Sequence, residues 1–177
     1  QIKANINKGG NMGFDLYGRN QKSSKGEYFR NNVWWWRPLA EYIIKYTNCV
    51  DEKDIQAWGH NDGHEVSEEE ATAIANQLKH LIRTGHTKKY AEDYEKERKQ
   101  AEDFNEKLER QLKALSKQVA KKLGKAEVAP KDFPEKEKQE WDNLYEKKLW
   151  EANYPFSVNN VTEFIEFAED SRGFRIC

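Results

Sequence analysis

The middle of the chain constrains the possible folds most strongly. From Thr87 to Leu123 the sequence is helix-forming and contains no glycine or proline. Its apolar residues form one narrow stripe with a seven-residue repeat, as in a coiled coil: Ala101, Leu108 and Leu115, interleaved with Leu112 and Val119 and flanked by Phe104 and Leu123. Such a helix needs a partner, because packing supplies most helical stability in water.

A second helix is predicted over residues 135–152, after the breaker-rich loop 124–134. Its apolar side carries Trp141, Leu144, Tyr145, Leu149 and Ala152. Two helices joined by a loop fold back on each other, so we expect residues 87–152 to form an inserted antiparallel helical hairpin. The second helix is the shorter one and leaves part of the stripe uncovered. We therefore expect a homodimer through the helical hairpin.

The two ends of the chain are globular in character. Residues 14–17 and 174–176 alternate apolar and polar side chains, and residues 27–34 are β-prone, which predicts short strands. We expect the last strand to pair with the first. Amphipathic helices are predicted from Pro38, after the capping residue Ser67, and after Ser157. The predicted fold class is α+β and mostly helical: a small sheet of N-terminal strands and the C-terminal strand, packed on amphipathic helices, with the hairpin inserted.

The predicted domain organisation is therefore a body of residues 12–86 plus 153–177 and an insertion of residues 87–152. Residues 1–11 differ in character from the rest. Read back into codons, Lys8 to Met12 match a ribosome-binding sequence followed by a start codon, so this segment is interpreted as a non-native leader, with a flexible arm as the alternative.

Composition excludes some partners. The 30 basic and 31 acidic residues nearly cancel, which gives no global field toward nucleic acid or a membrane. No apolar run is long enough to span a membrane and no signal peptide is visible, so we expect a cytoplasmic protein. The two cysteines lack metal-type spacing and are expected to be free thiols.

Three consecutive tryptophans, Trp34, Trp35 and Trp36, raise the question of a binding site. Neighbouring residues of a helix diverge by about 100°, so three cannot share one buried face. Two carboxylates and two arginines flank them, namely Asp15, Glu27, Arg30 and Arg37. Indole faces and guanidinium groups suit a nucleotide-like or other anionic ligand. The alternative is that Trp34 and Trp36 fill the core while the arginine stems cover it.

Two other groups of residues are candidates for chemistry. His60, Asp62 and His64 alternate around a turn and offer three metal-binding side chains, although Asn61-Asp62-Gly63 is also an ordinary turn sequence. Six basic residues without an intervening acid close the long helix: Arg110, Lys113, Lys117, Lys121, Lys122 and Lys125. They are interpreted as a solvated face that complements the helix C-terminus, with phosphate binding as the alternative.

The stretches MGFDLYG, GEYFRNNVWWWRPL, NDG before a capped helix, and YPFSVNNVTEFIEFAEDSRGFRIC together resemble a family of small uncharacterised proteins from bacteria and bacteriophages. The resemblance covers both ends of the chain and not its helical middle. It implies a bacterial or phage source, a shared fold and Met12 as the first residue. It implies no catalytic residue, because that family has no assigned activity.

The sequence contains no nucleophile motif, phosphate-binding loop or dinucleotide fingerprint. We therefore predict a non-enzymatic ligand-binding or protein-interaction protein that uses its aromatic and arginine residues and needs no cofactor. The alternative is a small metal-dependent enzyme or metal-binding protein that uses His60, Asp62 and His64.

Overall fold

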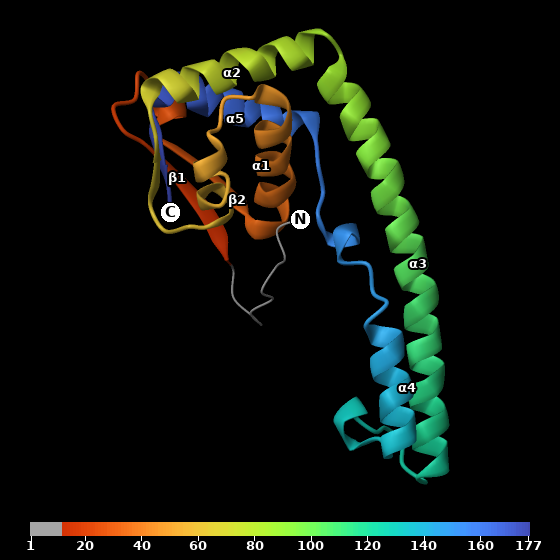
Figure 1. Cartoon of the computed structure of the whole chain (residues 1–177). Coiled ribbons are helices and arrows are strands. Elements are labelled where there is room, and N and C mark those ends of the chain that lie inside the picture. Colours follow the sequence, from red (N-terminus) through yellow and green to blue (C-terminus); the bar gives the residue numbers. More distant parts are fainter. Residues whose placement is uncertain (1–11) are drawn as a thin grey trace. The chain divides into compact units, whose positions relative to one another are not determined.

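The computed structural model describes residues 12–177, so the interpretation of residues 1–11 lies outside the described residues. The chain divides into two compact units: a body that runs up to Glu95 and resumes at Tyr154–Cys177, and a hairpin unit, Lys96–Asn153. The sequence suggests boundaries at 87 and 152 instead. The mostly helical α+β fold is confirmed, with a small antiparallel sheet and several helices (Figure 1).

Within the described residues, the body contains four strands and three whole helices, together with the first part of α3. The strands are β1 (Gly13–Gly18), β2 (Tyr28–Asn32), β3 (His64–Val66) and β4 (Phe174–Ile176). The helices lying wholly in the body are α1 (Val33–Thr47), α2 (Glu68–Arg83) and α5 (Val158–Ser171), with the short 3-10 turns η1 (Ser24–Gly26), η2 (Glu52–Asp54) and η3 (Ala57–Gly59). Helix α3 (His86–Lys122) continues into the hairpin unit, which also holds η4 (Pro130–Asp132), α4 (Glu135–Tyr145) and η5 (Trp150–Asn153).

The four strands form one antiparallel sheet in the order β2-β1-β4-β3. The predicted pairing of the last strand with the first is confirmed, with Leu16 opposite Ile176 and Tyr17 opposite Arg175. Strand β3 was not predicted, because its three residues follow a turn sequence and are too few to show alternation. It pairs with β4, so that the last strand of the chain lies inside the sheet.

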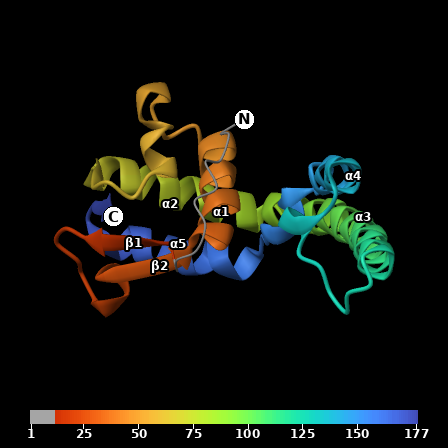
Figure 2. The same cartoon turned by 90° about the horizontal axis from the view of Figure 1, so that it is seen from below.

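In the described part of the chain, helices cover one face of this sheet (Figure 2). Its apolar side chains are buried on that face: Phe14, Leu16, Phe29, Val66, Phe174 and Ile176. The alternate positions, among them Tyr17, Tyr28, Arg30 and Arg175, are exposed. This is the period-two pattern of a half-buried antiparallel sheet.

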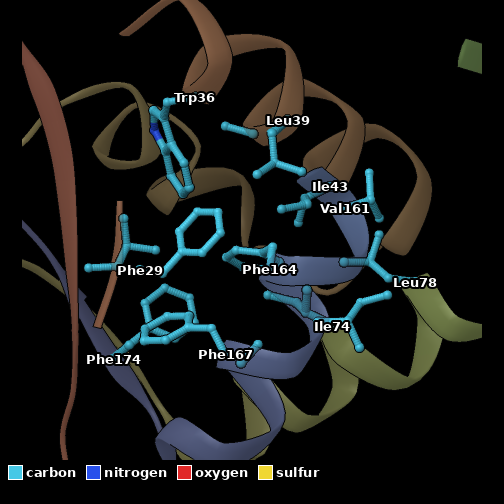
Figure 3. Close-up of a cluster of buried hydrophobic side chains, with 14 of the residues drawn as sticks. Phe29, Trp36, Leu39, Ile43, Ile74, Leu78, Val161, Phe164, Phe167 and Phe174 are labelled. Carbon is cyan, nitrogen blue, oxygen red and sulfur yellow. The ribbon is translucent and has the colours of Figure 1, made fainter. Parts of the chain in front are cut away.

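Helix α5 forms the centre of the body (Figure 3). Phe164 meets the sheet through Phe29 at a ring-centroid distance of 5.6 Å and through Phe174 at 5.9 Å. The other side of α5 packs against α2, where Ile74 and Leu78 are fully buried. The buried Asn31 and Asn160 exchange two side-chain hydrogen bonds, of 3.0 and 2.7 Å, which satisfy both amides between β2 and α5.

Helix α1 begins at Val33, five residues before Pro38, where the sequence suggests a start. The cause is the Asn32 side chain, whose oxygen accepts hydrogen bonds from the backbone N–H groups of Trp34 and Trp35, both at 3.1 Å. Pro38 is consequently an internal helical residue. The three tryptophans therefore lie in the first turn of α1, ahead of the start predicted at Pro38.

The hairpin unit has a small core of its own. Leu115, Val119 and Ala120 pack with Val128 and Phe133 of the loop, and Trp141 and Leu144 lie against them. Helix α4 ends at Tyr145, so the predicted helix to residue 152 is too long by seven residues. The chain beyond it is held by Asn105, which donates to the carbonyl oxygen of Leu149 at 2.8 Å and accepts from its N–H at 2.9 Å.

This packing covers most of the stripe from which a dimer was predicted. Ala101, Leu108, Leu112, Leu115 and Val119 are buried within the chain, whereas Phe104 and Leu123 are exposed. The uncovered part of the stripe is therefore reduced to Phe104 and Leu123, and dimerisation stays a prediction. None of the helices among residues 12–177 is both long and apolar enough to cross a bilayer.

Gly26 offers a sharp test of how η1 packs on α5. A Cβ atom added there would lie 2.2 Å from the carbonyl carbon of Asp170, which is backbone and cannot move aside cheaply. We expect Gly26→Ala to destabilise the body by about 1–3 kcal/mol, as overpacking does. Amide hydrogen exchange should show faster exchange in β1 and α5, with the amides of the hairpin unit as an internal reference.

The matched control is Gly13→Ala, whose added Cβ would have the guanidinium end of Arg30 as its nearest neighbour, at 3.1 Å. A flexible side chain can move, so this variant should change stability by less than about 0.5 kcal/mol. Equal effects of the two substitutions would contradict the close approach at Gly26.

Candidate functional site

The three tryptophans do not form one cluster. Trp36 is fully buried, and its Nε1 donates a hydrogen bond of 2.7 Å to the carbonyl oxygen of Trp58. Its ring stacks on Phe14 at 5.4 Å and on Trp58 at 5.9 Å. For Trp36 the alternative interpretation, a structural core residue, is therefore the one that the packing supports.

Trp34 lies on the surface, with 39% of its area exposed. Its ring packs against Tyr154 at a centroid distance of 4.9 Å and an interplanar angle of 58°. Arg37, one helical turn further along α1, donates a hydrogen bond of 3.2 Å to the Tyr154 hydroxyl. We call Trp34, Arg37 and Tyr154 the aromatic–arginine surface. Trp35 is half-buried beside Trp34 in the sequence.

Backbone and side-chain contacts hold this surface in place. Tyr94 of α3 donates a hydrogen bond of 2.8 Å to the carbonyl oxygen of Tyr154, which fixes the chain where it re-enters the body. The guanidinium carbon of Arg37 lies 5.9 Å from the centre of the Tyr154 ring. Among the described residues no carboxylate forms an ion pair with Arg37, and Glu41 acts on it only as a more distant charge. Most of the five N–H donors of this guanidinium remain available.

Asp15, Arg30 and Glu27 belong to another part of the body. Arg30 Nε lies 3.5 Å from a carboxylate oxygen of Asp15, across the β1–β2 ladder on the exposed face of the sheet. Tyr28 donates a hydrogen bond to the same carboxylate, and this bond raises the pKa of the Tyr28 hydroxyl. Glu27 is exposed where β2 begins. The described residues show no contact that joins these side chains to Trp34, so the seven predicted ligand-binding residues are not one site.

Sequence reasoning missed Tyr154 and the pair Tyr17 and Tyr28. The two strand tyrosines lie opposite each other on β1 and β2, and their rings contact on the exposed face at a centroid distance of 5.2 Å and a tilt of 41°. The strand register, which reveals this pair, is known only from the structure. Tyr154 lies in an irregular segment far along the chain, where no periodic pattern marks it.

The predicted metal ligands lie in and beside the loop before β3. His60 follows η3, Asp62 is exposed in the turn, and His64 is the first residue of β3. Residues 12–177 contain no group of three or more His, Cys, Asp or Glu side chains placed to hold a metal ion. The geometry thus gives the metal-binding alternative no support, and it remains a prediction from sequence.

Three buried polar atoms near this loop have no hydrogen-bond partner among the described residues: Trp58 Nε1, His64 Nε2 and Glu70 Oε1. Burial raises the pKa of the Glu70 carboxyl, while the charge of His64 and a hydrogen bond with the Ser67 backbone oppose this rise. The nearby Asp54 and Asp51 raise it further. Glu70 also occupies the capping-box position of α2, whose N-cap Ser67 accepts from the Glu70 N–H at 3.1 Å.

Comparison with known proteins found no matching family model, no matching curated protein and no matching solved structure. The surfaces described above are therefore interpreted from their own geometry and chemistry.

The raised pKa of Glu70 predicts a pH-dependent stability. A carboxyl whose folded-state pKa lies above its unfolded value stabilises the fold at low pH, and this contribution is lost as the pH rises through the folded value. Glu70→Gln removes the buried charge and should therefore raise the Tm at pH 7.5. The difference from the unsubstituted chain should shrink as the pH falls toward about 4, the ordinary range of a glutamate.

Glu69→Gln is the matched control, because Glu69 is an exposed residue in the same first turn of α2. The Glu69→Gln variant loses an interaction with the helix dipole similar to that lost in Glu70→Gln, but the charge that it removes is exposed. Thermal unfolding at several pH values measures both. A Glu70→Gln variant less stable than Glu69→Gln at pH 7.5 would show that the Glu70 charge is favourable where it lies.

Proposed function

We propose that the chain is a non-enzymatic binding protein that recognises a partner protein through the aromatic–arginine surface. In this proposal Trp34 and Tyr154 supply apolar contact area and Arg37 pairs with a carboxylate of the partner. Tryptophan, tyrosine and arginine are the residues most enriched among those that dominate the binding energy of protein interfaces.

The state of Arg37 is the observation that carries the proposal. Its guanidinium is positioned by a hydrogen bond to a phenol and has no carboxylate in ion-pair distance among the described residues. A planar, always charged group held in this way suits bidentate binding of a carboxylate. Because Tyr154 orients it beforehand, less side-chain entropy is lost when a partner binds.

The ring geometry favours a protein over a nucleotide-like ligand. The planes of Trp34 and Tyr154 meet at 58°, so these two rings do not provide parallel walls between which a base could stack. An indole with 39% of its area exposed can instead insert into a hollow of a partner surface. The resemblance to bacterial and bacteriophage proteins makes bacterial or phage proteins the first partners to test.

Photo-crosslinking tests this proposal and identifies the partner in the same experiment. A benzophenone amino acid at position 34 keeps an aromatic ring on the surface. On irradiation in cells that express the chain, we expect a discrete covalent adduct that mass spectrometry identifies as another protein. Arg37→Glu should reduce the adduct at least about tenfold, because it opposes a partner carboxylate with a like charge.

The matched control carries the same probe at Tyr17, which is similarly exposed but lies on the sheet. It should not give the same adduct. A screen of nucleotides by tryptophan fluorescence provides the competing outcome. Saturable binding of a nucleotide, lost in Arg37→Glu and without a specific protein adduct, would replace the protein partner by an anionic small ligand.

A further inference from the structure

A second candidate binding surface lies on the hairpin unit. Lys113, Lys117 and Lys121 follow one another at intervals of four residues along α3, and Lys125 continues the series just beyond the helix. All four are exposed. Within residues 12–177 none of them forms an ion pair, whereas the neighbouring Lys122 is paired with Glu137 at 2.5 Å. We call these four residues the lysine stripe.

The lysine stripe faces away from the packed side of the hairpin. Leu115 and Val119 are buried against the loop and α4, and Leu112 is buried as well. With 3.6 residues per turn, Lys117 projects roughly 140° away from Leu112 around the helix axis. Among the described residues, Lys122 at the flank is the lysine of this helix end that pairs with a carboxylate of α4. The positive charge of the stripe remains unneutralised.

The same helix is balanced in charge closer to the body. Lys99 pairs with Asp103 at 3.7 Å and Arg110 pairs with Glu106 at 3.4 Å, both one turn apart. Glu109, one turn before Lys113, pairs instead with Lys148 of the returning chain at 3.4 Å. The balanced pattern ends there, and no acidic residue follows until Glu127.

Helix stability does not account for the lysine stripe. Cations favour a helix C-terminus only within its last turn, which covers Lys121 but not Lys113 and Lys117. Positive charges one turn apart on a helix repel each other, so the stripe weakens α3 unless an anion approaches. This arrangement suits a partner that carries regularly spaced negative charges.

We propose that the lysine stripe binds the phosphate backbone of double-stranded nucleic acid without reading its sequence. Flexible ammonium groups act as point charges for phosphates, and the stripe contains no arginine or aromatic side chain to read or stack a base. The helical part of the stripe, from Lys113 to Lys121, is roughly two turns long and can lie along the dense row of phosphates of a duplex. Anionic membranes fit less well, because the residues between the lysines on this face, Ala114 and Gln118, are not the apolar anchors of a membrane-surface helix.

From the sequence, phosphate binding is the alternative interpretation of these lysines, and the leading expectation is against nucleic acid. That expectation rested on the nearly neutral net charge of the whole chain. The local net charge of the hairpin unit depends on which lysines form ion pairs with carboxylates. These pairs are known only from the structure.

The salt dependence of binding tests the proposal. Fluorescence anisotropy is measured with the full chain and two 20-base-pair duplexes of unrelated sequence. Four phosphate contacts predict that log K falls against log salt concentration with a slope of about −3 to −4 for both duplexes. Lys117→Gln with Lys121→Gln should make the slope shallower by about 2 and weaken binding at least about tenfold at low salt.

The matched control is Lys136→Gln with Lys138→Gln on α4, which removes the same charge from exposed positions of the same unit. It should leave the slope within about 0.5 of the original. Circular dichroism checks that both variants retain their helices. Equal losses in the two variants, or binding to phosphatidylserine vesicles without binding to either duplex, would overturn the proposal.

Discussion

The position of β4 is the constraint on which the body depends. This strand pairs with β1 on one side and β3 on the other, so the sheet is complete only when the two ends of the sequence have met. Helix α5 leads directly into this strand: it ends at Ser171, and the turn to β4 passes through Gly173, whose φ is 86°. A Cβ atom at Gly173 would lie 2.8 Å from the carbonyl oxygen of Val66 in β3, so close an approach requires glycine. The contact between Tyr94 and Tyr154 then secures the chain at both sides of the insertion, and this lets a long hairpin interrupt the body without disturbing the sheet.

Local signals predicted those elements whose stability is local. Ser67 and Ser157 cap α2 and α5 as expected, and alternation located β1 and β4, because side-chain oxygens and period-two burial leave marks in a short window of sequence. The errors arose where distant residues decide. Strand β3 is defined by its hydrogen-bonded pairing with β4. Helix α4 ends at Tyr145, and a few residues later the backbone at Leu149 is hydrogen-bonded to Asn105 of α3. The start of α1 is decided locally, because the Asn32 cap begins the helix five residues before Pro38, the residue whose position in the sequence indicates a start.

In the candidate site too, local sequence signals and distant contacts determine different features. Adjacency in sequence suggested that three tryptophans and four charged residues act together, but helix and strand geometry send neighbours in different directions. Trp36 enters the core, Trp34 stays on the surface, and Arg30 lies on the sheet with Asp15. The residue that completes the aromatic–arginine surface is Tyr154, which lies 117 positions from Arg37 in the sequence and directly after the hairpin unit. The sequence therefore indicates that aromatic and cationic residues form a surface. Which residues form it is known only from the tertiary structure.

The two proposed surfaces differ in the physical basis of recognition and lie in separate compact units. On the body, rigid aromatic area and one oriented guanidinium favour a particular complementary shape, and such contacts depend weakly on salt once they are desolvated. On the hairpin unit, four mobile ammonium groups favour any dense row of phosphates, and this attraction weakens steeply with salt. Each unit has its own buried core, with Phe164 and its neighbours in one and Val119, Phe133 and Trp141 in the other. Exposed side chains can therefore be changed on one unit without removing core contacts from the other, so the two activities are separable by mutation and by ionic strength.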